Sequence, residues 1–523
     1  MTTLEQKRLD LLARLDAARS QSERNRMGQF GTPSALAGEV MRTALAMLPN
    51  GERVRFLEPG FGTGAFYSSL LNQAPGKRIE AAEGFEIDPH YGDEAARLWG
   101  GTPLALHQRD FLTTPPPAER ERFNLLISNP PYIRHHHIEP ERKPELQHMA
   151  ALRAGMKLSG LSGLYCYFMA AANAWMRAGG IGVWLIPSEF MDVNYGAELK
   201  SYLLRDVTLL RIHRFDPDEV QFEDALVSSA IVILKKERPS PQHRVEFTFG
   251  GTLTEPRVRK QVPTAQLTSE KKWTRFPVNG EREQSRFVLS DFFAIKRGIA
   301  TGGNEFFVLP SEEIDRRQLP RQFFRPILPG PRWLQQEVIE SDEEGVPLLD
   351  RSLFVLDCSL PEAEVRHRYP ALADYIDEGA RNGYRDRYLC SRRTPWYSQE
   401  QRQAPPFFCT YIGRTNTKSG RPFRFIQNNS SAIAANTYLL LYAKPELQVA
   451  LASNPSLKAG VWRILNDIPL ENLVLGGRVY GGGLHKLEPK ELAGVNADEL
   501  ATLVMSQPRA TKRSMTIQAE LAL

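Results

Sequence analysis

The sequence predicts an α/β protein: a mainly parallel sheet with crossover helices in the first half, then an α+β region. From Val54 to about residue 236, short apolar runs alternate with amphipathic segments, which is typical of strand–helix–strand units. The polar, proline-containing residues 236–244 (KERPSPQHR) interrupt this pattern. Beyond them, aromatic residues, arginines and short strand-like runs follow without regular order. We therefore expect two domains, residues 1–240 and residues 245–523.

The elements of the first domain can be predicted in chain order. Residues 4–20 are expected to form a helix because their apolar side chains recur at helical spacing. Residues 28–33 (GQFGTP) end that helix with two glycines and a proline, and a second helix is expected from Ala35 to Met47. The predicted strands are residues 54–59 (VRFLEP), 79–88 (IEAAEGFEID), 123–132 (FNLLISNPPY), 181–187 (IGVWLIP), 209–215 (LLRIHRF) and 228–236 (SSAIVILKK).

The composition excludes several classes of protein. Of the 523 residues, 42% are apolar and 24% are charged, so we expect no disorder on the scale of whole domains. The four cysteines lack zinc-site spacing, and their sparse use fits a reducing cytoplasm. The first ten residues carry charges where a signal peptide needs an apolar core, and no apolar run of about 18 residues predicts a membrane span. The net charge of +5 is compatible with nucleic-acid binding without requiring it.

A glycine-rich segment follows the first predicted strand. Residues 58–66 read EPGFGTGAF, and glycines let the backbone turn tightly and come close to a ligand. The helix expected next would add the positive end of its dipole. The spacing differs from the pyrophosphate fingerprint GxGxxG, and no Walker lysine is present. By itself, this segment is compatible with a nucleotide-type cofactor site and equally with a structural turn.

Acidic residues stand at the ends of the strands that follow. Glu86 lies about 20 residues past the glycine-rich turn, where a carboxylate can accept hydrogen bonds from both hydroxyls of a ribose. At the next strand end, Asp110 is placed to accept from an adenine amino group, and Phe111 to line the ring. Each residue alone also fits a solvated strand end. Because ligands of open α/β sheets bind at the carboxyl ends of the strands, the residues together favour a cofactor site.

The most specific signal is Asn129-Pro130-Pro131-Tyr132, directly after an apolar strand and about 65 residues past the glycine-rich turn. The exocyclic nitrogen of adenine is a poor nucleophile because its lone pair is drawn into the ring. The side-chain oxygen of Asn129 and the carbonyl of Pro130 can accept its two hydrogens, and the two prolines hold both acceptors in place. Tyr132 offers a flat face on which a base can stack. The competing interpretation is a proline-rich strand end with no catalytic role.

In this order, the motifs resemble those of the DNA adenine-N6 methyltransferases of restriction–modification systems. The matching class is the one in which cofactor motifs precede the catalytic motif and a target-recognition domain comes last. The resemblance covers about residues 27–236 and implies a Rossmann-like S-adenosylmethionine-dependent methyltransferase sheet, a C-terminal α+β target-recognition domain, and methylation of N6 of a flipped-out adenine. It assigns cofactor binding to Thr32, Pro33, Glu58, Gly60, Gly62, Gly64, Phe66, Glu86, Ile87, Asp110 and Phe111, and catalysis to Asn129, Pro130 and Tyr132.

A further match concerns the target base. Phe222 stands five residues before the Val-Ser pair that opens a predicted strand. In the family that the motifs resemble, an aromatic at this point stacks on the flipped adenine opposite the tyrosine, here Tyr132. Phe222 is therefore the candidate and Phe215 the alternative, while a buried loop phenylalanine is the structural interpretation. Two positions depart from the family pattern: Phe61 is bulkier than the residue often found in the glycine loop, and Gly163 stands where many relatives carry an acid.

Basic and aromatic residues gather in the second half of the chain. They concentrate in residues 381–393 (RNGYRDRYLCSRR) and 411–425 (YIGRTNTKSGRPFRF). Arginine and lysine neutralise phosphates, and arginine also reads guanine edges in the major groove. A solvated basic surface is the competing interpretation. We expect DNA contacts from Arg297, Arg385, Arg387, Arg392, Arg393, Arg414, Lys418, Arg421 and Arg424, with Thr301 also near the DNA.

The expected partner is double-stranded DNA, joined by a cognate restriction endonuclease on a separate chain where one exists. The first motif begins within 30 residues of the start, and no nuclease signature is evident in the second half. A single active site and an asymmetric second domain predict a monomer. The three consecutive histidines 135–137 cannot easily point at one ion and lack a partner ligand, so we expect no metal and, instead, contact with phosphate or base.

Other reactions stay open. An RNA N-methyltransferase or a protein-glutamine N-methyltransferase would use the same NPPY site, although the glutamine enzymes are much shorter and lack a large basic second domain. A DNA-binding protein with an inactive fold is disfavoured by Asn129, Tyr132 and Glu86. Cytosine-N4 transfer usually goes with serine at position 129, and cytosine-C5 transfer needs a Pro-Cys pair that the chain lacks. The recognition sequence cannot be predicted, because side chains on unplaced loops determine it.

Overall fold

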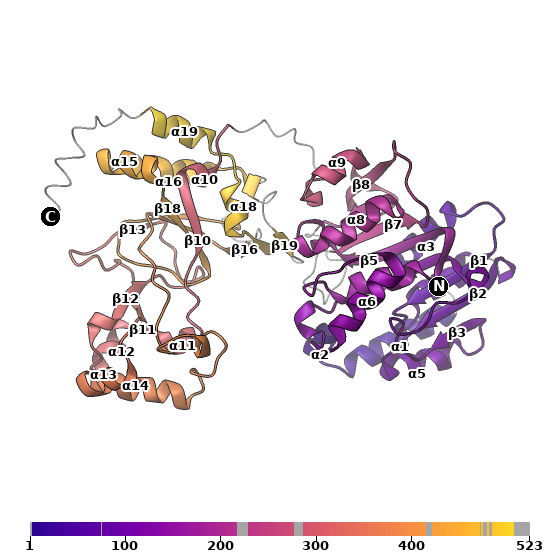
Figure 1. The fold of residues 1–523 in the computed structure, drawn as a ribbon, viewed down its shortest axis with the longest axis horizontal. Helices are drawn as coiled ribbons and strands as arrows, with labels where there is room; N and C mark the ends of the chain where they lie inside the picture. The colour runs from indigo at the N-terminus through magenta and orange to yellow at the C-terminus, as the bar shows by residue number, and fades with distance from the viewer. Residues whose placement is uncertain are drawn as a thin grey trace. The chain divides into compact units, whose positions relative to one another are not determined.

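A computed structural model describes residues 3–74, 76–216, 229–276, 286–414, 421–470, 472–473, 478–480 and 484–506. The chain separates into two compact units that divide near residue 280 (Figure 1). Each unit has its own sheet and its own core. Among the helices of the described ranges, none combines the length and the apolar composition that crossing a membrane requires.

The first unit is built on a nine-stranded sheet. Five neighbouring strands run parallel, and the chain moves outward from β1 in one direction and then, after β3, in the other. This reversal beside β1 confirms the predicted Rossmann-like α/β fold and creates a switch point between β1 and β4. In sheet order, the strands are β3 (Leu104–His107), β2 (Ile79–Phe85), β1 (Val54–Pro59), β4 (Phe123–Ser128), β5 (Met176–Pro187), β7 (Ser229–Lys235), β6 (Thr208–Arg214), β8 (Arg244–Gly251) and β9 (Pro256–Pro263).

The first unit continues beyond the boundary that the sequence predicts at residues 240–245. Strand β8 pairs parallel with β6, and β9 pairs antiparallel with β8, so both extend the same sheet. Residues 236–243 form the connection between β7 and β8. Because proline and polar residues mark tight connections as well as domain linkers, the sequence does not distinguish the two. The first compact unit therefore extends to about residue 280, not residue 240.

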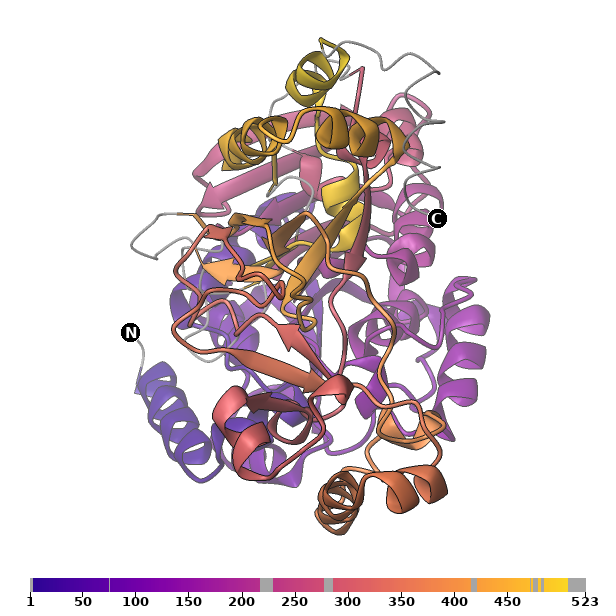
Figure 2. The same cartoon turned by 90° about the vertical axis from the view of Figure 1, so that its left-hand side faces the viewer.

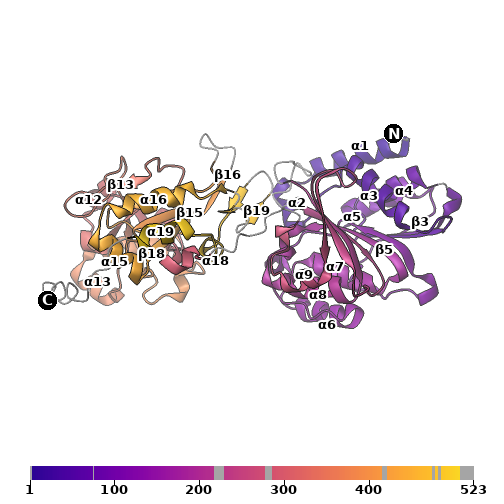
Figure 3. The same ribbon diagram turned by 90° about the horizontal axis from the view of Figure 1, so that it is seen from above.

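Helices cover both faces of this sheet (Figure 3). Alternate residues of a strand face opposite sides: Phe56 of β1 packs in the core under α3, α4 and α5, whereas Leu57 packs in the core under α6, α7 and α8. The central strands β1 and β4 are nearly fully buried, as expected for a sheet covered on both faces. The helices are α1 (Thr3–Ala17), α2 (Gln21–Met27), α3 (Ser34–Met47), α4 (Ala65–Gln73), α5 (Pro89–Trp99), α6 (Arg142–Ala154), α7 (Leu164–Asn173), α8 (Ala197–Arg205) and α9 (Thr264–Ser269).

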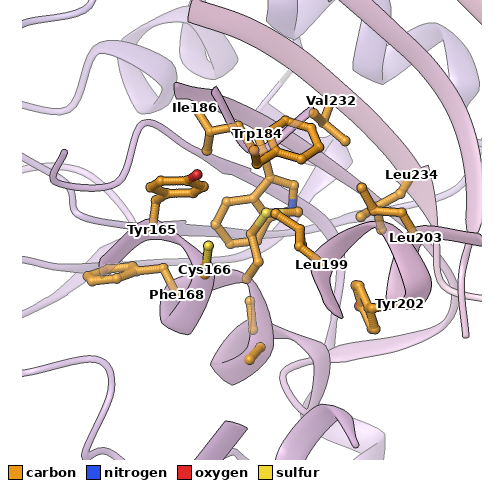
Figure 4. Close-up of a cluster of buried hydrophobic side chains, with 14 of the residues drawn as sticks. Tyr165, Cys166, Phe168, Trp184, Ile186, Leu199, Tyr202, Leu203, Val232 and Leu234 are labelled. Carbon is orange, nitrogen blue, oxygen red and sulfur yellow. The ribbon is translucent and has the colours of Figure 1, made fainter. Parts of the chain in front are cut away.

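Helix α7 is the centre of one of these cores. It is apolar on all sides and its residues from Leu164 to Ala172 are buried, as expected of a helix enclosed by other elements. Figure 4 shows Tyr165 and Cys166 of α7 gathered with Trp184 of β5 and with Leu199 of α8. The backbone N–H of Leu164 also donates to the carbonyl of Ile133 at 2.9 Å. Helix α7 therefore anchors the segment that follows β4 to the core.

The second unit has a five-stranded sheet, most of whose pairs are antiparallel. Figures 1 and 2 show α15, α16 and α19 gathered at one end of this unit and α12, α13 and α14 at the other. This is the predicted α+β composition. In order, the strands are β10 (Phe293–Arg297), β18 (Tyr438–Ala443), β15 (Phe407–Thr410), β17 (Phe425–Asn428) and β13 (Val338–Ile339); a smaller sheet holds β11 (Val308–Pro310), β14 (Leu353–Leu356) and β12 (Phe324–Ile327), and β16 (Ile412–Arg414) pairs with β20 (Leu484–Lys486).

Two helical groups complete the second unit. The first covers one face of the five-stranded sheet, with Leu447, Val461 and Leu500 buried against it. The second packs with the smaller sheet around Phe306, whose ring stacks on that of Tyr375 at 4.8 Å. The helices are α10 (Leu289–Phe292), α11 (Asn304–Phe307), α12 (Ser311–Arg316), α13 (Glu362–Arg368), α14 (Pro370–Arg381), α15 (Pro445–Ser453), α16 (Leu457–Asp467), α18 (Pro489–Ala493) and α19 (Asp498–Met505).

Candidate cofactor and active site

A cavity of about 470 Å³ lies at the carboxyl ends of β1, β2 and β4 in the first unit. This is the switch point at which open α/β sheets bind ligands, and the volume lies in the range of small-molecule sites. Most residues that the sequence analysis assigns to the cofactor meet here, although they come from separate motifs. Those lining the cavity are Thr32, Glu58, Gly60, Gly62, Phe66, Glu86, Ile87, Asp110 and Phe111, joined by Asn129.

The segment of residues 28–33 packs directly against the NPPY segment. The backbone N–H of Tyr132 donates to the carbonyl of Gly28 at 3.1 Å. Gly28 has a φ of +65°, and a Cβ at this position would lie 2.4 Å from the backbone nitrogen of Tyr132. Only glycine fits there, because the conformation is left-handed and the neighbouring atoms are backbone. The glycine at position 28 is therefore a requirement of the contact between the two motifs.

Asn129 is held by its amide nitrogen. This nitrogen donates to the carbonyl of Phe30 at 3.0 Å and to the hydroxyl of Thr32 at 3.1 Å. The side-chain amide is planar, so its oxygen points away from these two acceptors. Asn129 follows β4, whose Ser128 donates to the carbonyl of Pro59 at 2.5 Å. The Asn129 oxygen is thereby given a defined direction beside the cavity.

The Glu86 carboxylate stands at the end of β2 and is buried. One oxygen accepts from the N–H of Gly62 at 2.8 Å, and the other accepts from the N–H of Asp88 at 2.9 Å. Burial raises the pKa of Glu86 above its ordinary value, although these hydrogen bonds act to lower it. Each oxygen has a second lone pair, so the carboxylate can accept further hydrogen bonds from a ligand.

Asp110 and Phe111 follow β3 and form another part of the cavity wall. Asp110 accepts from the N–H of Leu112 at 2.9 Å and forms an ion pair with Arg142 of α6. The ring of Phe111 is buried and stacks on that of Phe168, with centroids 5.8 Å apart. This wall combines an oriented carboxylate with apolar ring surface.

Glu58 has a structural contact within its own motif. The N-cap residue of α4, Gly64, has no side chain with which to cap the helix. The buried carboxylate of Glu58 instead accepts from the N–H of Tyr67 in the first turn of α4 at 2.9 Å. A carboxylate at this point also interacts favourably with the helix dipole. Burial nevertheless raises the pKa of Glu58 to about 8. Glu58 lines the cavity and, at the same time, caps α4.

The bulky Phe61 is accommodated by two glycines. A Cβ on Gly84 of β2 would lie 2.4 Å from the Phe61 ring, and so would a Cβ on Gly64. The ring is buried and lies 6.2 Å from that of Tyr67. The departure from the family pattern at position 61 is therefore compensated by missing side chains at positions 64 and 84.

Four predicted site residues do not line the cavity. Pro33 precedes α3 as its N-cap residue, and Gly64, with a φ of +81°, precedes α4. Pro130 lies between the cavity residues Asn129 and Pro131. Tyr132 is buried: its ring centroid lies 5.6 Å from that of Phe30, and its hydroxyl donates to the carbonyl of Leu185 at 3.1 Å.

Phe222 and Phe215 are the two residues predicted to stack on the target base opposite Tyr132. Phe222 lies outside the described residues. Phe215, the alternative, is buried in the core beneath α3 and α4, and its ring lies 4.8 Å from that of His213. Phe215 therefore packs in the core in this structure.

The histidine segment lies near the cavity. Residues His135–His137 form a short 3-10 helix after the NPPY segment, and His137 lines the cavity. The pKa of His136 is lowered by slight desolvation and by the neighbouring basic residues. Within the described ranges, no group of three histidine, cysteine or acidic side chains has the arrangement of a metal site.

The predicted DNA-contacting residues of the second unit fall into two groups. Arg393 donates to the carbonyls of Ala300 and Thr301, and Arg424 to those of Pro331 and Leu334. These guanidinium groups hold loops of their own unit together. Arg421, although exposed, also donates to a backbone carbonyl, that of Asn466, and Thr301 is buried. The remaining described residues, Arg297, Arg385, Arg387, Arg392 and Arg414, are exposed, and Lys418 lies outside the described residues.

Two groups beside the cavity were not found by sequence reasoning. Arg142 pairs with Asp110, and Arg19 with Gln29 contacts Asp88. All of these contacts join segments far apart in the chain, and neither Arg142 nor Arg19 belongs to a motif. The only local signal is Asp88 before Pro89, the pattern of a helix start, which α5 follows.

Family models match both units of the chain. The model described as Eco57I restriction-modification methylase matches residues 78–222, and that of the Type II methyltransferase M.Eco57I, C-terminal domain, matches residues 272–518. Type II methyltransferase M.AccI of Acinetobacter calcoaceticus is 24% identical over 90% of this chain and 85% of its own. Type II methyltransferase M.XamI of Xanthomonas campestris pv. amaranthicola is 26% identical over 91% of this chain and 86% of its own.

One solved structure shows the same fold. The Type IIL restriction-modification enzyme MmeI, solved in complex with DNA, gives a TM-score of 0.52 at 13% identity, over 84% of this chain and 66% of that one. The chain thus spans slightly less than two thirds of that enzyme. The type IIG restriction endonuclease BpuSI gives a TM-score of 0.44 at 13% identity, over 92% of this chain and 62% of that one. At such low identity, the likeness shows the fold alone.

The two family models match in chain order, and together they span most of the sequence. The two Type II methyltransferases align over nine tenths of it. The motif order, the sheet with its switch point and the cavity lined by those motifs agree with these matches. The chain therefore matches the Eco57I family of restriction–modification methyltransferases in both of its units, the methylase domain in the first and the C-terminal domain in the second.

Proposed function

We propose that this chain is a site-specific DNA methyltransferase that transfers a methyl group from S-adenosylmethionine to N6 of a flipped-out adenine. The methylated DNA is thereby protected from a cognate restriction endonuclease. The observation that carries this proposal is the position of Asn129. Its amide nitrogen is tied to residues 30 and 32, and its oxygen stands beside a cavity that Glu86 and Asp110 also line.

The cavity residues suit S-adenosylmethionine. The Glu86 carboxylate would accept the ribose hydroxyls, and Asp110 would accept from the adenine amino group; both line the cavity. The Phe111 ring and Ile87 would supply apolar surface for the adenine, and Thr32 would contact the methionine moiety. The tight turns at Gly60 and Gly62, both with positive φ, would let the backbone come close to the ligand without a Cβ in between. When bound, the cofactor supplies an electrophilic methyl group on a sulfonium.

Asn129 and Pro130 prepare the nucleophile. The Asn129 side-chain oxygen and the Pro130 carbonyl accept the two hydrogens of the adenine amino group, which favours a pyramidal nitrogen with a localised lone pair. The contacts of Asn129 with Phe30 and Thr32 fix this acceptor before the base arrives, and such preorganisation lowers the barrier. The surplus amino proton leaves to solvent after transfer, so no general base is required. Tyr132 and Phe222 are the proposed stacking partners of the base.

The second unit is the proposed DNA-reading domain. Its exposed arginines, Arg297, Arg385, Arg387, Arg392 and Arg414, are the candidates to face phosphates or guanine edges. Of these, Arg387 also donates to the Gly302 carbonyl and pairs with Glu305, and Arg385 pairs with Glu362. We assign Arg393 and Arg424 instead to holding its loops, because both are only partly exposed and each donates to at least two carbonyls of the same unit. We further propose that the enzyme acts as a monomer in the cytoplasm, with its partner nuclease on another chain.

The proposal is tested with purified protein, unmethylated plasmid DNA and methyl-labelled S-adenosylmethionine, followed by digestion of the DNA to nucleosides. The Asn129→Ala variant is compared with Glu139→Ala, a substitution at an exposed position of the following segment that does not line the cavity. We expect label in N6-methyladenine with the wild type and Glu139→Ala. With Asn129→Ala, we expect a loss on the order of 10²–10³-fold, the usual effect of removing one preorganised hydrogen-bonding group.

Other outcomes would redirect the assignment. Label entering RNA or a protein glutamine of a cell extract, and none entering DNA, would replace the DNA substrate by one of the alternative acceptors at the same site. Label recovered as N4-methylcytosine would overturn the choice of adenine. Equal activity of Asn129→Ala and wild type would remove the proposed role of Asn129.

A further inference from the structure

The N-terminal segment forms one wall of the cavity. Residues 26–32 line it in an unbroken run, and Leu12 and Asp16 of α1 extend the same wall. None of the residues that precede position 28 belongs to a recognised motif. Hydrogen bonds from the Tyr132 N–H to the Gly28 carbonyl and from the Asn129 amide to the Phe30 carbonyl tie this wall to the NPPY segment. Side-chain contacts with Asp88 tie it to the start of α5.

Asp88 accepts hydrogen bonds from Gln29 of this wall and from Arg19, which lies between Asp16 and residue 26 in the chain. Both of its carboxylate oxygens accept from Arg19, at 2.5 and 3.1 Å. One also accepts from the Gln29 amide at 2.7 Å, and the other from the N–H of His90 at 3.0 Å. Burial opposes ionisation of Asp88, but these hydrogen bonds keep its pKa below the ordinary value. The carboxylate is thus ionised, and its donors come from both the wall and α5.

Asp88 is also connected to the cofactor-facing carboxylate. Its own backbone N–H donates to Glu86 at 2.9 Å, and the other Glu86 oxygen accepts from Gly62. Any shift of Asp88 therefore acts on Glu86. Through Asp88, the position of the N-terminal wall is linked to the group proposed to hold the ribose.

A second ion pair between the N-terminal segment and α5 serves as a control. Arg14 of α1 pairs with Glu94 of α5 at 2.5 Å, but the Arg14 side chain is 65% exposed, against 21% for Arg19. Exposed ion pairs contribute little to stability. Neither Arg14 nor Glu94 lines the cavity. The Arg14–Glu94 pair joins α1 to α5, and the Arg19–Asp88 pair joins the segment after α1 to the N-cap residue of α5. The two pairs differ in burial and in their connection to Glu86.

We propose that Arg19 is a positioning residue for the cofactor: its bidentate pair with Asp88 holds the N-terminal wall and Glu86 in the binding geometry. This inference rests on the proposed function only in taking the cavity as the S-adenosylmethionine site. Arg19 does not itself line the cavity. Its loss therefore weakens cofactor binding and leaves the transfer step nearly unchanged once the cofactor is saturating.

The test is the affinity for S-adenosylhomocysteine, measured by calorimetry on the full chain without DNA. We expect Arg19→Ala to raise Kd about tenfold, since hydrogen bonds to charged groups typically have effects of this size. Arg19→Lys keeps the charge without the planar fork and is expected to fall between Ala and wild type. Gln29→Ala removes one neutral donor and should raise Kd about threefold. Arg14→Ala should stay within about twofold of wild type.

Methylation kinetics separate positioning from general damage. With Arg19→Ala, KM for S-adenosylmethionine should rise by the same factor as Kd, while kcat changes less than about threefold. A kcat loss as large as the KM change, or equal Kd values for Arg19→Ala and Arg14→Ala, would overturn the positioning role. Arg19→Lys decides the question if Arg19→Ala lowers the melting temperature strongly, because Arg19, unlike Gln29, does not line the cavity.

The affinity for S-adenosylhomocysteine does not depend on which molecule accepts the methyl group. If the wild type binds the probe but methylates no DNA, the proposed function fails while the Arg19 comparison still stands. If the wild type does not bind the probe, the cavity is not the cofactor site and the Arg19 proposal is overturned as well.

Discussion

The two units place their predicted functional residues in different ways. In the first unit, residues from motifs tens of positions apart meet at one cavity, because parallel strands end at the same edge of the sheet. In the second unit, neighbouring arginines of one segment diverge. Arg392 is exposed and lies over the Tyr388 ring at 4.3 Å, whereas Arg393 donates to the carbonyls of Ala300 and Thr301.

The difference shows which sequence patterns carry positional information. A residue at the carboxyl end of a strand has its place set by the sheet, so the motifs alone are enough to assign Glu86 and Asn129 to the cavity. The direction of a basic side chain on a loop is not set in this way. Of two adjacent basic residues on a loop, one can face the solvent and the next can face the protein. Motif residues can therefore be tested singly, and loop arginines are best tested in adjacent pairs.

The largest effect is expected at the contact between the first two motifs. Gly28→Ala would place a Cβ 2.4 Å from the backbone of Tyr132 at a φ of +65°, so the NPPY segment must shift. Misplacement of reacting groups by about 1 Å can cost about 10²-fold in rate, and we expect kcat to fall by at least that factor. Steady-state methylation of plasmid DNA measures it.

Gly51→Ala is the matched control. Gly51 also has a positive φ, +80°, but an added Cβ would meet no atom within 4 Å. Gly51→Ala should show only the conformational cost, about 1–2 kcal/mol of stability, with unchanged kcat. If both variants lose the same activity, backbone strain explains the loss and the close approach at Gly28 does not.

The next prediction concerns Glu58, a motif residue that stabilises the fold, in contrast to the motif residues that are proposed to contact the cofactor. Burial raises the pKa of Glu58 to about 8 from an ordinary value near 4.5. Between these values, the folded protein binds the proton and the unfolded chain releases it, so stability falls as the pH rises from about 4.5 to 8. At about 1.4 kcal/mol per pKa unit, the loss is on the order of a few kcal/mol.

Glu58→Gln should flatten this pH dependence, because an amide does not ionise. The difference in melting temperature between wild type and variant is measured at each pH, since His213, whose pKa burial lowers to about 4, acts in the opposite direction below about pH 6.5. Parallel curves for the two proteins between pH 5 and 8 would show that Glu58 is ionised in the folded state.

A smaller effect tests the divergence of adjacent arginines in the second unit. Arg393→Ala removes a charged donor from at least two backbone carbonyls and should cost about 1.5–3 kcal/mol, or several degrees in melting temperature. Arg392→Ala should leave the melting temperature unchanged, weaken DNA binding and lower the salt dependence by about one phosphate contact. Anisotropy titrations with DNA at several salt concentrations measure this, and the opposite pattern would exchange the two roles.

The fold could be predicted from sequence to the level of single strands. Residues 54–59 were expected as a strand and form β1 with those bounds, because apolar runs between turn signals are local information. The predicted strand at 123–132 ends at Ser128 in the structure, where the prolines begin. The end of the first unit differs from the prediction because a proline-rich turn and a linker look alike in sequence.

The site residues that belong to motifs could be predicted from the sequence. The side-chain contacts that hold these residues in place could not. The pair of Arg19 with Asp88 joins residues 69 positions apart, and no periodicity or spacing indicates it. The cap that Glu58 provides to α4 is equally absent from the sequence pattern, although Glu58 itself was assigned to the cofactor motif. Such contacts depend on which segments the fold brings together, and only the structure supplies that.

The smallest effect concerns the hydroxyl of Tyr132. This hydroxyl donates to the carbonyl of Leu185 at 3.1 Å inside the protein, so it is not available to a base. Tyr132→Phe should cost about 1 kcal/mol of stability and change kcat and the KM for DNA less than about threefold. Tyr132→Ala removes the ring and should raise the KM for DNA about tenfold or more, since stacking contributes about 1–3 kcal/mol per base. A large loss of kcat in Tyr132→Phe would mean that the hydroxyl leaves Leu185 and takes part in transfer, and the first unit would then rearrange on binding DNA.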